Sequence, residues 1–375
     1  MANRTRVLLL FGGRSAEHEV SIVSASFIAR SLDPASYEVL LVGIDRDGRW
    51  LEFPSGALDG VGSAADACMP AAGRSVMFPP FPSPIGAPRL QRDDGSALHF
   101  DVIFPVLHGP LGEDGAIQGL FELADVAYVG SGVSSSAVGM DKVLQKQLLE
   151  HAELSVVPYR WFGQGRWQRE ADACLRDCLE LGLPLFVKPA NMGSSQGIRR
   201  VATEEELAPA IEFALEFDNK VLVEQGLESP REIELAVLGN DTPEVSLPGE
   251  IVVHHESGWY SYEAKYIDDG AELCVPARLQ PAEVSGLQRL ALQTFRTLGC
   301  SGLARIDLFV AAGQAYVNEV NTMPGFTAIS MYPQLWAASG RAAPQLVHEL
   351  VELAQQEHAG RTTLRTTRKL DKVEP

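Results

Sequence analysis

The sequence predicts a chain of α/β and α+β domains that form three lobes around a cleft. Three observations lead to this prediction. The chain opens with an apolar strand, a helix and a second strand, its middle mixes helices and strands, and short strands dominate from residue 221 onward. A β-α-β start is typical of doubly wound α/β domains, and a strand-rich segment with few helices is typical of α+β domains. The 375 residues suffice for two or three domains.

The first elements alternate between strand and helix. Residues 7–11 are a continuous apolar run that ends in two glycines, which indicates a buried parallel strand entering a tight turn. Residues 54–98 are rich in Pro, Gly, Ser and Ala, so we expect an irregular surface excursion there. The other elements of this part are expected as a helix ending before Asp33, strands at 37–44 and 100–106, and helices at 115–123 and 134–151.

The second half is predicted from the same signals. Residues 361–375 are polar and lack apolar periodicity, which predicts a disordered tail. The expected strands are 182–189, 221–225, 231–238, 249–254, 303–310 and 315–320, and the expected helices are 204–216, 280–298 and 344–357.

The charge balance narrows the range of partners. The chain has 31 basic and 49 acidic residues, a formal charge of −18, which disfavours nucleic acid and acidic membrane surfaces. Lysine is scarce, so each internal lysine hints at a specific role, although we interpret Lys146 and Lys220 as ordinary surface lysines. With no signal peptide and no apolar run long enough to span a bilayer, we expect a cytoplasmic protein without a membrane partner.

Two alternating segments, 302–310 and 315–326, predict a β-hairpin with a polar face. Residues two apart share a face of a strand, so Arg305 and Asp307 point the same way, as do Glu319 and Asn321. Pairing Asp307 with Glu319 centres the turn near Gly313. Such oxygen ligands suit Mg²⁺ or Mn²⁺ with phosphates completing the shell. A solvated hairpin face is the alternative, and the apolar residues around it disfavour that interpretation.

A second segment, 183–197, joins an apolar strand to a glycine- and serine-rich loop. Lys188 at the strand end can reach phosphate oxygens, and the loop with Ser194 and Ser195 can cover them. Neither a P-loop nor a G-x-G-x-x-G motif is present, which argues against a nicotinamide oxidoreductase. Taken alone, the segment is equally compatible with a flexible surface loop.

Three further segments end strands with polar residues. Glu17 follows the first strand and its glycine turn, where ligands of α/β sheets bind, and its carboxylate suits a substrate ammonium or a helix N-terminus. His108 lies in a second strand-end loop, where a lone histidine is more often structural. The strand at 221–225 ends in a polar pair that can present its backbone to a purine.

Together these segments resemble the D-alanine–D-alanine ligases, a branch of the ATP-grasp enzymes. The resemblance runs from about residue 5 to residue 358, and Gln196 departs from it where a small apolar residue is common. It rests on eight motifs in order: GGRSAEHEVS, LHGPLGEDG, GSGVSSSAVGMDK, LFVKPANMGSSQG, VEQGL, EAKYID, ARIDLF and NEVNTMPGFTAISMYP.

The resemblance implies a three-domain ATP-grasp architecture with an N-terminal Rossmann-like domain. It implies an N-terminal substrate domain at 1–140, a central ATP-grasp domain at 141–225 and a C-terminal one at 226–360. It also implies ligation of two D-alanines through a D-alanyl phosphate, with ATP as co-substrate and two Mg²⁺ ions, Mn²⁺ being an alternative. We further expect a homodimer and a role in peptidoglycan synthesis.

The resemblance also assigns roles to residues. The implied ATP-binding residues are Lys142, Lys188, Ser195, Glu224, Gln225, Leu227, Glu232 (to the ribose) and Lys265. The implied substrate-binding residues are Glu17 (the first D-alanine's ammonium), His108, Arg305, Gly325, Ser330 and Met331. Glu17, Ser194, Arg305, Tyr266, Gly325 and Ser330 are the implied catalytic set, and Asp307, Glu319 and Asn321 the metal ligands.

Two alternatives stay open. The same scaffold can serve a D-alanine–D-lactate or D-alanine–D-serine ligase, although Tyr266 favours the dipeptide over the ester. A non-catalytic nucleotide-binding regulator is disfavoured by the intact metal-ligand set. The segment 255–270, which holds Lys265 and Tyr266, is expected to close over the site when nucleotide binds.

Overall fold

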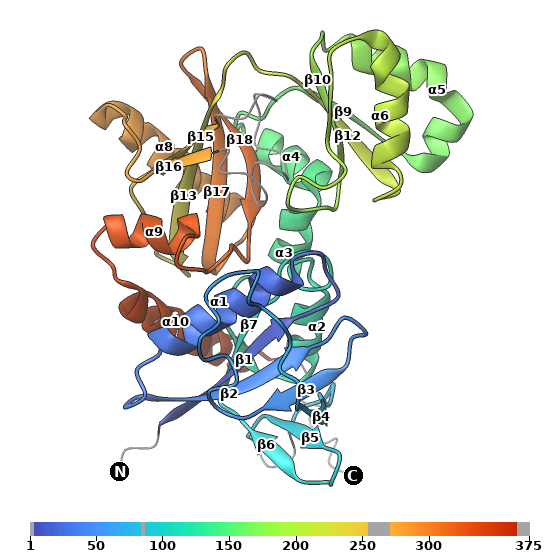
Figure 1. Cartoon of the computed structure of the whole chain (residues 1–375). Helices are drawn as coiled ribbons and strands as arrows, with labels where there is room; N and C mark the ends of the chain where they lie inside the picture. The colour runs from blue at the N-terminus through green and yellow to red at the C-terminus, as the bar shows by residue number, and fades with distance from the viewer. Residues whose placement is uncertain (1–3, 84–86, 254–270, 366–375) are drawn as a thin grey trace, which may run out of the picture.

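The computed structural model describes residues 4–83, 87–253 and 271–365, which form three sheets with their own helices (Figure 1). The first sheet has eight strands in the order β6-β5-β4-β3-β2-β1-β7-β8. Strands β2, β1, β7 and β8 run parallel, and β3 to β6 extend the sheet in antiparallel pairs. The strands are β1 (Thr5–Gly12), β2 (Tyr37–Ile44), β3 (Trp50–Phe53), β4 (Arg74–Met77), β5 (Arg89–Arg92), β6 (Ala97–His99), β7 (Val102–Val106) and β8 (Ala127–Tyr128).

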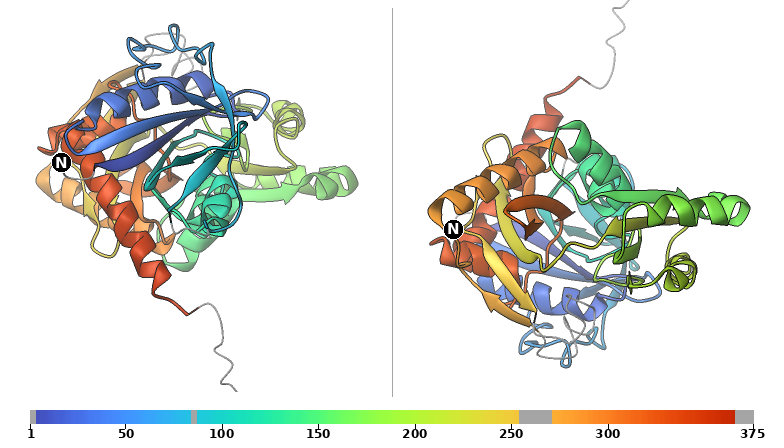
Figure 2. Two further views of the ribbon diagram at one scale, coloured as in Figure 1. Left: turned by 90° about the horizontal axis from the view of Figure 1, so that it is seen from below. Right: turned by 90° about the horizontal axis from the view of Figure 1, so that it is seen from above.

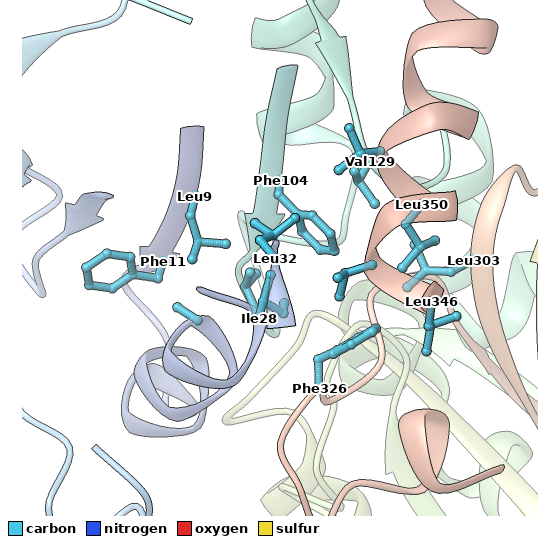
Figure 3. Packing of buried hydrophobic residues seen from close by; sticks show 14 of the residues in the cluster. Leu9, Phe11, Ile28, Leu32, Phe104, Val129, Leu303, Phe326, Leu346 and Leu350 are labelled. Atoms are coloured by element: carbon cyan, nitrogen blue, oxygen red, sulfur yellow. The ribbon is translucent and has the colours of Figure 1, made fainter. Parts of the chain in front are cut away.

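Helices cover both faces of this sheet, which explains the unbroken apolar run of β1. Leu9 and Phe11 share a core cluster with α1 (His18–Ser31) and α10 (Ala343–Thr362) (Figure 3). Leu8 and Leu10 belong to a second cluster, which includes residues of α2 (Ala116–Leu123). Because alternate side chains of a strand point to opposite faces, both faces of β1 are buried, and the predicted parallel strand is confirmed.

The excursion at 54–98 is more regular than we expected. It contributes the antiparallel strands β4, β5 and β6, which pair in sequence beyond β3. Val76, Phe78 and Leu90 from this segment are buried in the same cluster as Leu8 and Leu10. The prediction of irregular structure is confirmed for residues 54–73, which form turns and coil, and was wrong for the three short strands that follow, between which Pro and Gly residues mark the turns.

The predicted helix at 134–151 is in fact two helices, α3 (Val133–Met140) and α4 (Lys142–His151). Asp141 between them has extended backbone angles, and its carboxylate accepts hydrogen bonds from the N–H groups of Val143 and Leu144, each at 3.1 Å. This is an N-cap, and it begins α4 in a new direction. Lys142 therefore stands at the first residue of α4.

The second sheet has four strands in the order β11-β10-β12-β9. With its helices it extends to one side of the first and third sheets (Figures 1 and 2). Alternate residues of β10 and β12, such as Val187 and Val223, are buried with residues of α5 and α6 in one cluster. Lys188 and Glu224 alternate with them and so face away from these helices. The elements are β9 (Tyr159–Gly163), α5 (Gln164–Leu179), β10 (Leu185–Pro189), β11 (Arg199–Val201), the 3₁₀ turn Glu204–Glu206, α6 (Leu207–Ala214) and β12 (Lys220–Gln225).

The third sheet has six strands and is covered on one face by α8. Its order is β16-β15-β13-β17-β18, with β14 paired to β13. Ile306 and Val320 pack with Phe295 of α8, so the alternate residues of β17 and β18 face the opposite side. The elements are β13 (Arg231–Gly239), β14 (Glu244–Val245), β15 (Gly249–Val253), β16 (Ala271–Cys274), α8 (Pro281–Thr297), β17 (Gly302–Ala311), β18 (Gln314–Asn321) and α9 (Met331–Ala338).

The closing helix α10 joins the last part of the chain to the first sheet. Leu346 and Leu350 pack in the cluster of Leu9, together with Leu303 of β17 (Figure 3). The helix continues to Thr362, beyond the range predicted for it and into the range predicted as a disordered tail. Its longer extent agrees with contacts at its end, where Arg361 and His358 bond to Glu122 and Asp125. Within the described residues, no helix is long and apolar enough to cross a membrane.

Candidate active site

A cavity of about 1020 Å³ lies where the second and third sheets face each other. Strands β10 and β12 supply one wall, β13, β15, β17 and β18 supply the other, and α4 contributes its first residue. This volume is at the upper end of the range for small-molecule sites, so the cavity can take a ligand of nucleotide size. Nine predicted site residues line it: Lys142, Lys188, Ser195, Glu224, Gln225, Leu227, Glu232, Asp307 and Glu319.

The hairpin of β17 and β18 has the register that the sequence predicted. Asp307 lies opposite Glu319, Arg305 opposite Asn321, and the chain turns at Ala312 and Gly313. Both turn residues have positive φ, +49° and +79°, as a tight two-residue hairpin requires. The register shifts after Asp307, which marks a bulge beside the polar residues. The prediction of one polar face carrying these four side chains is confirmed.

Arg305 holds this polar face together. Its Nε and Nη2 donate to Asp307 Oδ1 and Oδ2, each at 2.7 Å, and Nε lies 2.9 Å from Glu234 Oε2. Burial acts to lower the pKa of Arg305, but the Asp307 and Glu234 carboxylates outweigh it and hold the pKa well above its usual value. Arg305 is therefore a fixed cation. Glu234 was missed from the sequence, although its alternation with Glu232 along β13 was a usable signal.

The donors on this face fit a divalent cation. Asn321 Nδ2 donates to Asp307 Oδ2 at 2.9 Å, so the carboxamide and the carboxylate lie side by side. Glu319, opposite Asp307, has its carboxylate 3.4 Å from Lys142 Nζ. Two carboxylates and one carboxamide form the hard oxygen set that Mg²⁺ and Mn²⁺ prefer. Among the described residues no group of three or more His, Cys, Asp or Glu side chains is arranged to hold a metal ion.

The opposite wall carries lysines. Glu224 forms ion pairs through Oε2 with Lys188 and through Oε1 with Lys146, the latter at 2.5 Å. Burial acts to raise the pKa of Glu224, but the two lysines outweigh it and lower that pKa to about 2. Lys142 Nζ donates to the Met192 carbonyl at 2.7 Å and so ties α4 to the loop after β10.

Lys146 contradicts our expectation of a surface lysine. Its side chain is only 1% exposed, because it lies between α4 and β12 with its ammonium on Glu224. The sequence held a signal for this position, since Lys146 follows Lys142 by one helical turn and so shares its face of α4. Lys220 is also paired, with Asp141, and is not a free surface lysine either.

The glycine- and serine-rich loop after β10 reaches Glu17 of the first domain. Ser194 Oγ donates to Glu17 Oε1 at 2.5 Å, and both Ser194 and Ser195 have positive φ, +52° and +56°. A Cβ on Gly193 would lie 3.6 Å from Glu17 Oε2 and 3.9 Å from Glu113 Oε1, so the loop passes close to both carboxylates. The predicted contact between Ser194 and Glu17 is present.

Glu113 is a site residue that the sequence reasoning missed. It lies in the GEDG part of the second glycine-rich motif, and its Oε1 accepts the Gly109 N–H at 2.8 Å. Burial, followed by the negative charge of Glu17, raises the pKa of Glu113 to about 8. The carboxyl beside Glu17 is therefore neutral over much of the physiological range. The signal was weak, because a Glu next to an Asp in a loop is ordinarily a surface feature.

His108 is held inside the protein rather than in the cavity lining. It is 4% exposed, with Nδ1 3.1 Å from the Met323 carbonyl and Nε2 3.4 Å from Ser24 Oγ. Burial lowers its pKa, which favours the neutral ring. These contacts fix the loop after β7 against the turn before Gly325.

The segment after β18 brings Gly325 and Ser330 together. Ser330 Oγ accepts the Thr327 N–H at 3.0 Å, and a Cβ on Gly325 would meet that Oγ at 3.1 Å. Ser330 precedes α9, and the Met331 side chain is buried in the core, so only the Met331 backbone is available to a ligand. Lys265 and Tyr266, with the rest of the predicted closing segment, lie outside the described residues.

Two sheets that face each other across such a cavity, one with lysines and one with a carboxylate hairpin, form the ATP-grasp fold. The chain belongs to the D-alanine–D-alanine ligase family, whose N-terminal part ("D-ala D-ala ligase N-terminus") matches residues 6–131 and whose C-terminal part ("D-ala D-ala ligase C-terminus") matches residues 148–352.

Individual relatives agree over nearly the whole length. D-alanine–D-alanine ligase A of Bradyrhizobium diazoefficiens is 45% identical over 97% of this chain and 98% of its own. The D-alanine–D-alanine ligase A of Escherichia coli K12 is 44% identical over 97% of this chain and 99% of its own. The solved D-alanine–D-alanine ligase of Coxiella burnetii superposes with a TM-score of 0.82 at 34% identity, over 96% of this chain and 98% of that one. The VanG D-Ala:D-Ser ligase of Enterococcus faecalis superposes with a TM-score of 0.81 at 32% identity, over 94% of this chain and 100% of that one. The predicted family and fold are confirmed.

Proposed function

We propose that this ligase uses ATP to join two D-alanines into D-alanyl-D-alanine through a D-alanyl phosphate, supplying peptidoglycan synthesis. One observation supports this most strongly. Lys188 and Lys142 contribute to the cavity from one side, Asp307 and Glu319 from the other, and the Ser194–Glu17 contact links the loop after β10 to the first domain. A triphosphate with its cation fits between such walls, beside a carboxylate that suits an ammonium group.

The nucleotide is assigned to the cavity end formed by β12 and β13. Residues 224–227 follow the cavity wall where β12 ends, and their backbone can read the edge of the adenine. We assign Glu232 on β13, which lines the cavity, as the hydrogen-bond acceptor for the ribose. Lys142, Lys188 and Ser195 then reach the phosphates, with Lys265 joining them from the segment outside the described residues.

The metal is assigned to the hairpin. Asp307, Glu319 and Asn321 would hold one or two Mg²⁺ or Mn²⁺ ions, which when bound neutralise charge on the phosphate oxygens. Lys142 is already beside Glu319, so the same carboxylate connects the metal site to a phosphate-binding lysine.

The substrates are assigned to the side nearer the first domain. Glu17, oriented by Ser194, binds the ammonium of the first D-alanine. The carboxylate of that D-alanine is then free to attack the γ-phosphorus of ATP. The bond from that phosphorus to the β–γ bridging oxygen breaks, ADP leaves, and a D-alanyl phosphate remains. The loop and Tyr266 exclude water, because an acyl phosphate hydrolyses readily.

The second D-alanine completes the reaction. Ser330 and the Met331 backbone bind its carboxylate, and its deprotonated amine attacks the acyl carbon. Arg305 and the Gly325 N–H stabilise the oxyanion that forms, and inorganic phosphate leaves as the amide forms. His108, fixed behind this site, orients the turn that carries Gly325.

The second substrate is the part of the proposal that needs a direct test, because one structural relative is a D-Ala:D-Ser ligase. The enzyme is given ATP and Mg²⁺ with equal D-alanine, D-serine and D-lactate at pH 7, and the products are separated by mass. We expect the D-alanine dipeptide to dominate. Predominant D-alanyl-D-serine or depsipeptide would replace the substrate assignment while leaving the ATP chemistry in place.

The domain boundaries, a homodimeric state and a cytoplasmic location are also proposals. Domain boundaries near residues 140 and 225 agree with the break at Asp141 and with the start of the third sheet at Arg231. A homodimer is tested by light scattering on the purified chain. A cytoplasmic location is tested by cell fractionation.

A further inference from the structure

Lys146 is a buried cation to which nothing above assigns a role. Its side chain is 1% exposed and that of its partner, Glu224, is 3% exposed. The ammonium also lies 5.8 Å from the centre of the Tyr159 ring. Burying a charge costs several kcal/mol even when it is paired. A buried lysine on a carboxylate that already has a second lysine therefore needs an explanation.

The two lysines share Glu224 evenly. Lys146 takes Oε1 and Lys188 takes Oε2, so each carboxylate oxygen has one ammonium. Lys188 and Glu224 line the cavity, whereas Lys146 does not and lies behind them on α4. A pair of Lys188 and Glu224 alone is neutral, and the addition of Lys146 gives the group a net charge of +1.

The charges around Lys188 and Glu224 determine whether the extra charge of Lys146 affects the binding of an anion. The neighbouring cation, Lys142, is beside Glu319, so that pair also sums to zero. Burial lowers the pKa of Lys146, with the charge of Lys188 adding to this, whereas the carboxylates of Glu224 and Glu150 oppose it, so the net charge of +1 applies to the protonated ammonium. Glu150, one turn further along α4, is bonded to the Tyr159 hydroxyl at 2.9 Å. The whole chain carries −18. Among the described residues of this wall, Arg200 of β11 also lines the cavity, so Lys146 adds to the positive charge around Lys188 rather than supplying all of it.

We propose that Lys146 is a positioning residue for the nucleotide, which compensates Glu224 from behind so that Lys188 keeps its positive charge available to the phosphates. This inference rests on the proposed function, because it assumes that a nucleotide occupies the cavity. It predicts an effect that grows with the charge of the ligand. The triphosphate of ATP depends on Lys146, and uncharged adenosine does not.

The test measures binding of ATP with Mg²⁺, of ADP and of adenosine to the full-length protein by isothermal titration calorimetry. We expect Lys146→Met to weaken ATP binding roughly tenfold, the scale of one unit charge acting on another over about 12 Å at an effective dielectric constant of about 20. The same substitution should weaken ADP binding less and change adenosine binding by less than about twofold. Lys146→Arg should keep most of the wild-type ATP affinity, because it keeps the charge.

A matched control and a second variant make the test specific. Lys220→Met removes another ion pair between β12 and the start of α4, with Asp141, and Lys220 does not line the cavity, so ATP affinity should stay within about twofold. The double variant Lys146→Met/Glu224→Gln removes a cation and an anion together. It restores the net charge of +1 and should recover the ratio of ATP to adenosine affinity, even if Lys146→Met alone folds poorly.

The outcomes separate this inference from the proposed function. Equal weakening of ATP and adenosine by Lys146→Met, or unchanged ATP affinity, overturns the role of Lys146. The role is overturned as well if Lys146→Met/Glu224→Gln has the same ratio of ATP to adenosine affinity as Lys146→Met. Wild-type protein that binds no ATP overturns the proposed function itself.

Discussion

The neutral carboxyl of Glu113 predicts a pH-dependent stability that one substitution removes. Burial and the charge of Glu17 raise the pKa of Glu113 to about 8, against an ordinary value of 4.5. Lys142 opposes the shift, and Glu319 adds to it. In the unfolded chain the carboxyl ionises near 4.5, so the unfolded state gains free energy as the pH rises from 4.5 to 8. Stability is therefore complete below about pH 4.5 and is lost progressively up to about pH 8.

The size of the effect follows from the pKa. A change from 4.5 to about 8 corresponds to at most about 5 kcal/mol of unfolding free energy. Glu113 is partly accessible to water, so we expect on the order of 2 kcal/mol. Glu113→Gln is neutral at every pH, and its amide oxygen can still accept the Gly109 N–H. The variant should therefore be more stable than wild type at pH 8.5 and about equally stable at pH 5.

Urea denaturation of both proteins at pH 5, 7 and 8.5, without nucleotide or metal, measures this difference. Glu212→Gln, which changes an exposed glutamate of α6, is the control and should leave the pH profile unchanged. Parallel pH profiles for wild type and Glu113→Gln would refute the reasoning, because they would mean that Glu113 has an ordinary pKa in the folded protein.

Three other substitutions test the assigned site. Glu319→Gln should abolish ligation while leaving the melting temperature within a few degrees, and near-normal turnover at saturating Mg²⁺ would remove Glu319 from the metal set. Lys188→Ala should raise KM for ATP at least tenfold and KM for D-alanine much less, and an unchanged ATP dependence would make Lys188 structural. Ser194→Ala removes a hydrogen bond to the charged Glu17, worth about 1.5–3 kcal/mol, and should raise KM for the first D-alanine tenfold or more. A change confined to KM for the second D-alanine would contradict the assignment of Glu17.

The sequence was most informative where polar and apolar residues alternate along a strand. The alternation around Asp307 and Glu319 defined both the hairpin register and its polar face, because a strand leaves only two faces for a side chain. The apolar run at residues 7–11 of β1 was equally clear, since the part of a strand that is covered on both faces is built from apolar residues.

The sequence was least informative where a local signal competes with a tertiary one. Asp141 fits the pattern of one more helical residue between two helical segments, and its extended backbone and cap bonds show that it is an N-cap. The buried position of Lys146 depends on β12, which lies more than seventy residues later in the chain. Glu113 has its raised pKa because Glu17 approaches it from another loop. The burial of Lys146 and the raised pKa of Glu113 are created by contacts between distant segments, and no periodicity encodes them.

An isotope experiment determines whether the reaction passes through a D-alanyl phosphate. The enzyme is given ATP, Mg²⁺ and D-alanine with both carboxylate oxygens replaced by ¹⁸O, and the released phosphate and the dipeptide are analysed by mass spectrometry. The account predicts one D-alanyl-D-alanine for each phosphate, with one ¹⁸O atom in that phosphate, because the attacking carboxylate oxygen leaves with phosphorus. Dipeptide formed together with unlabelled phosphate, or phosphate released without dipeptide, would contradict it.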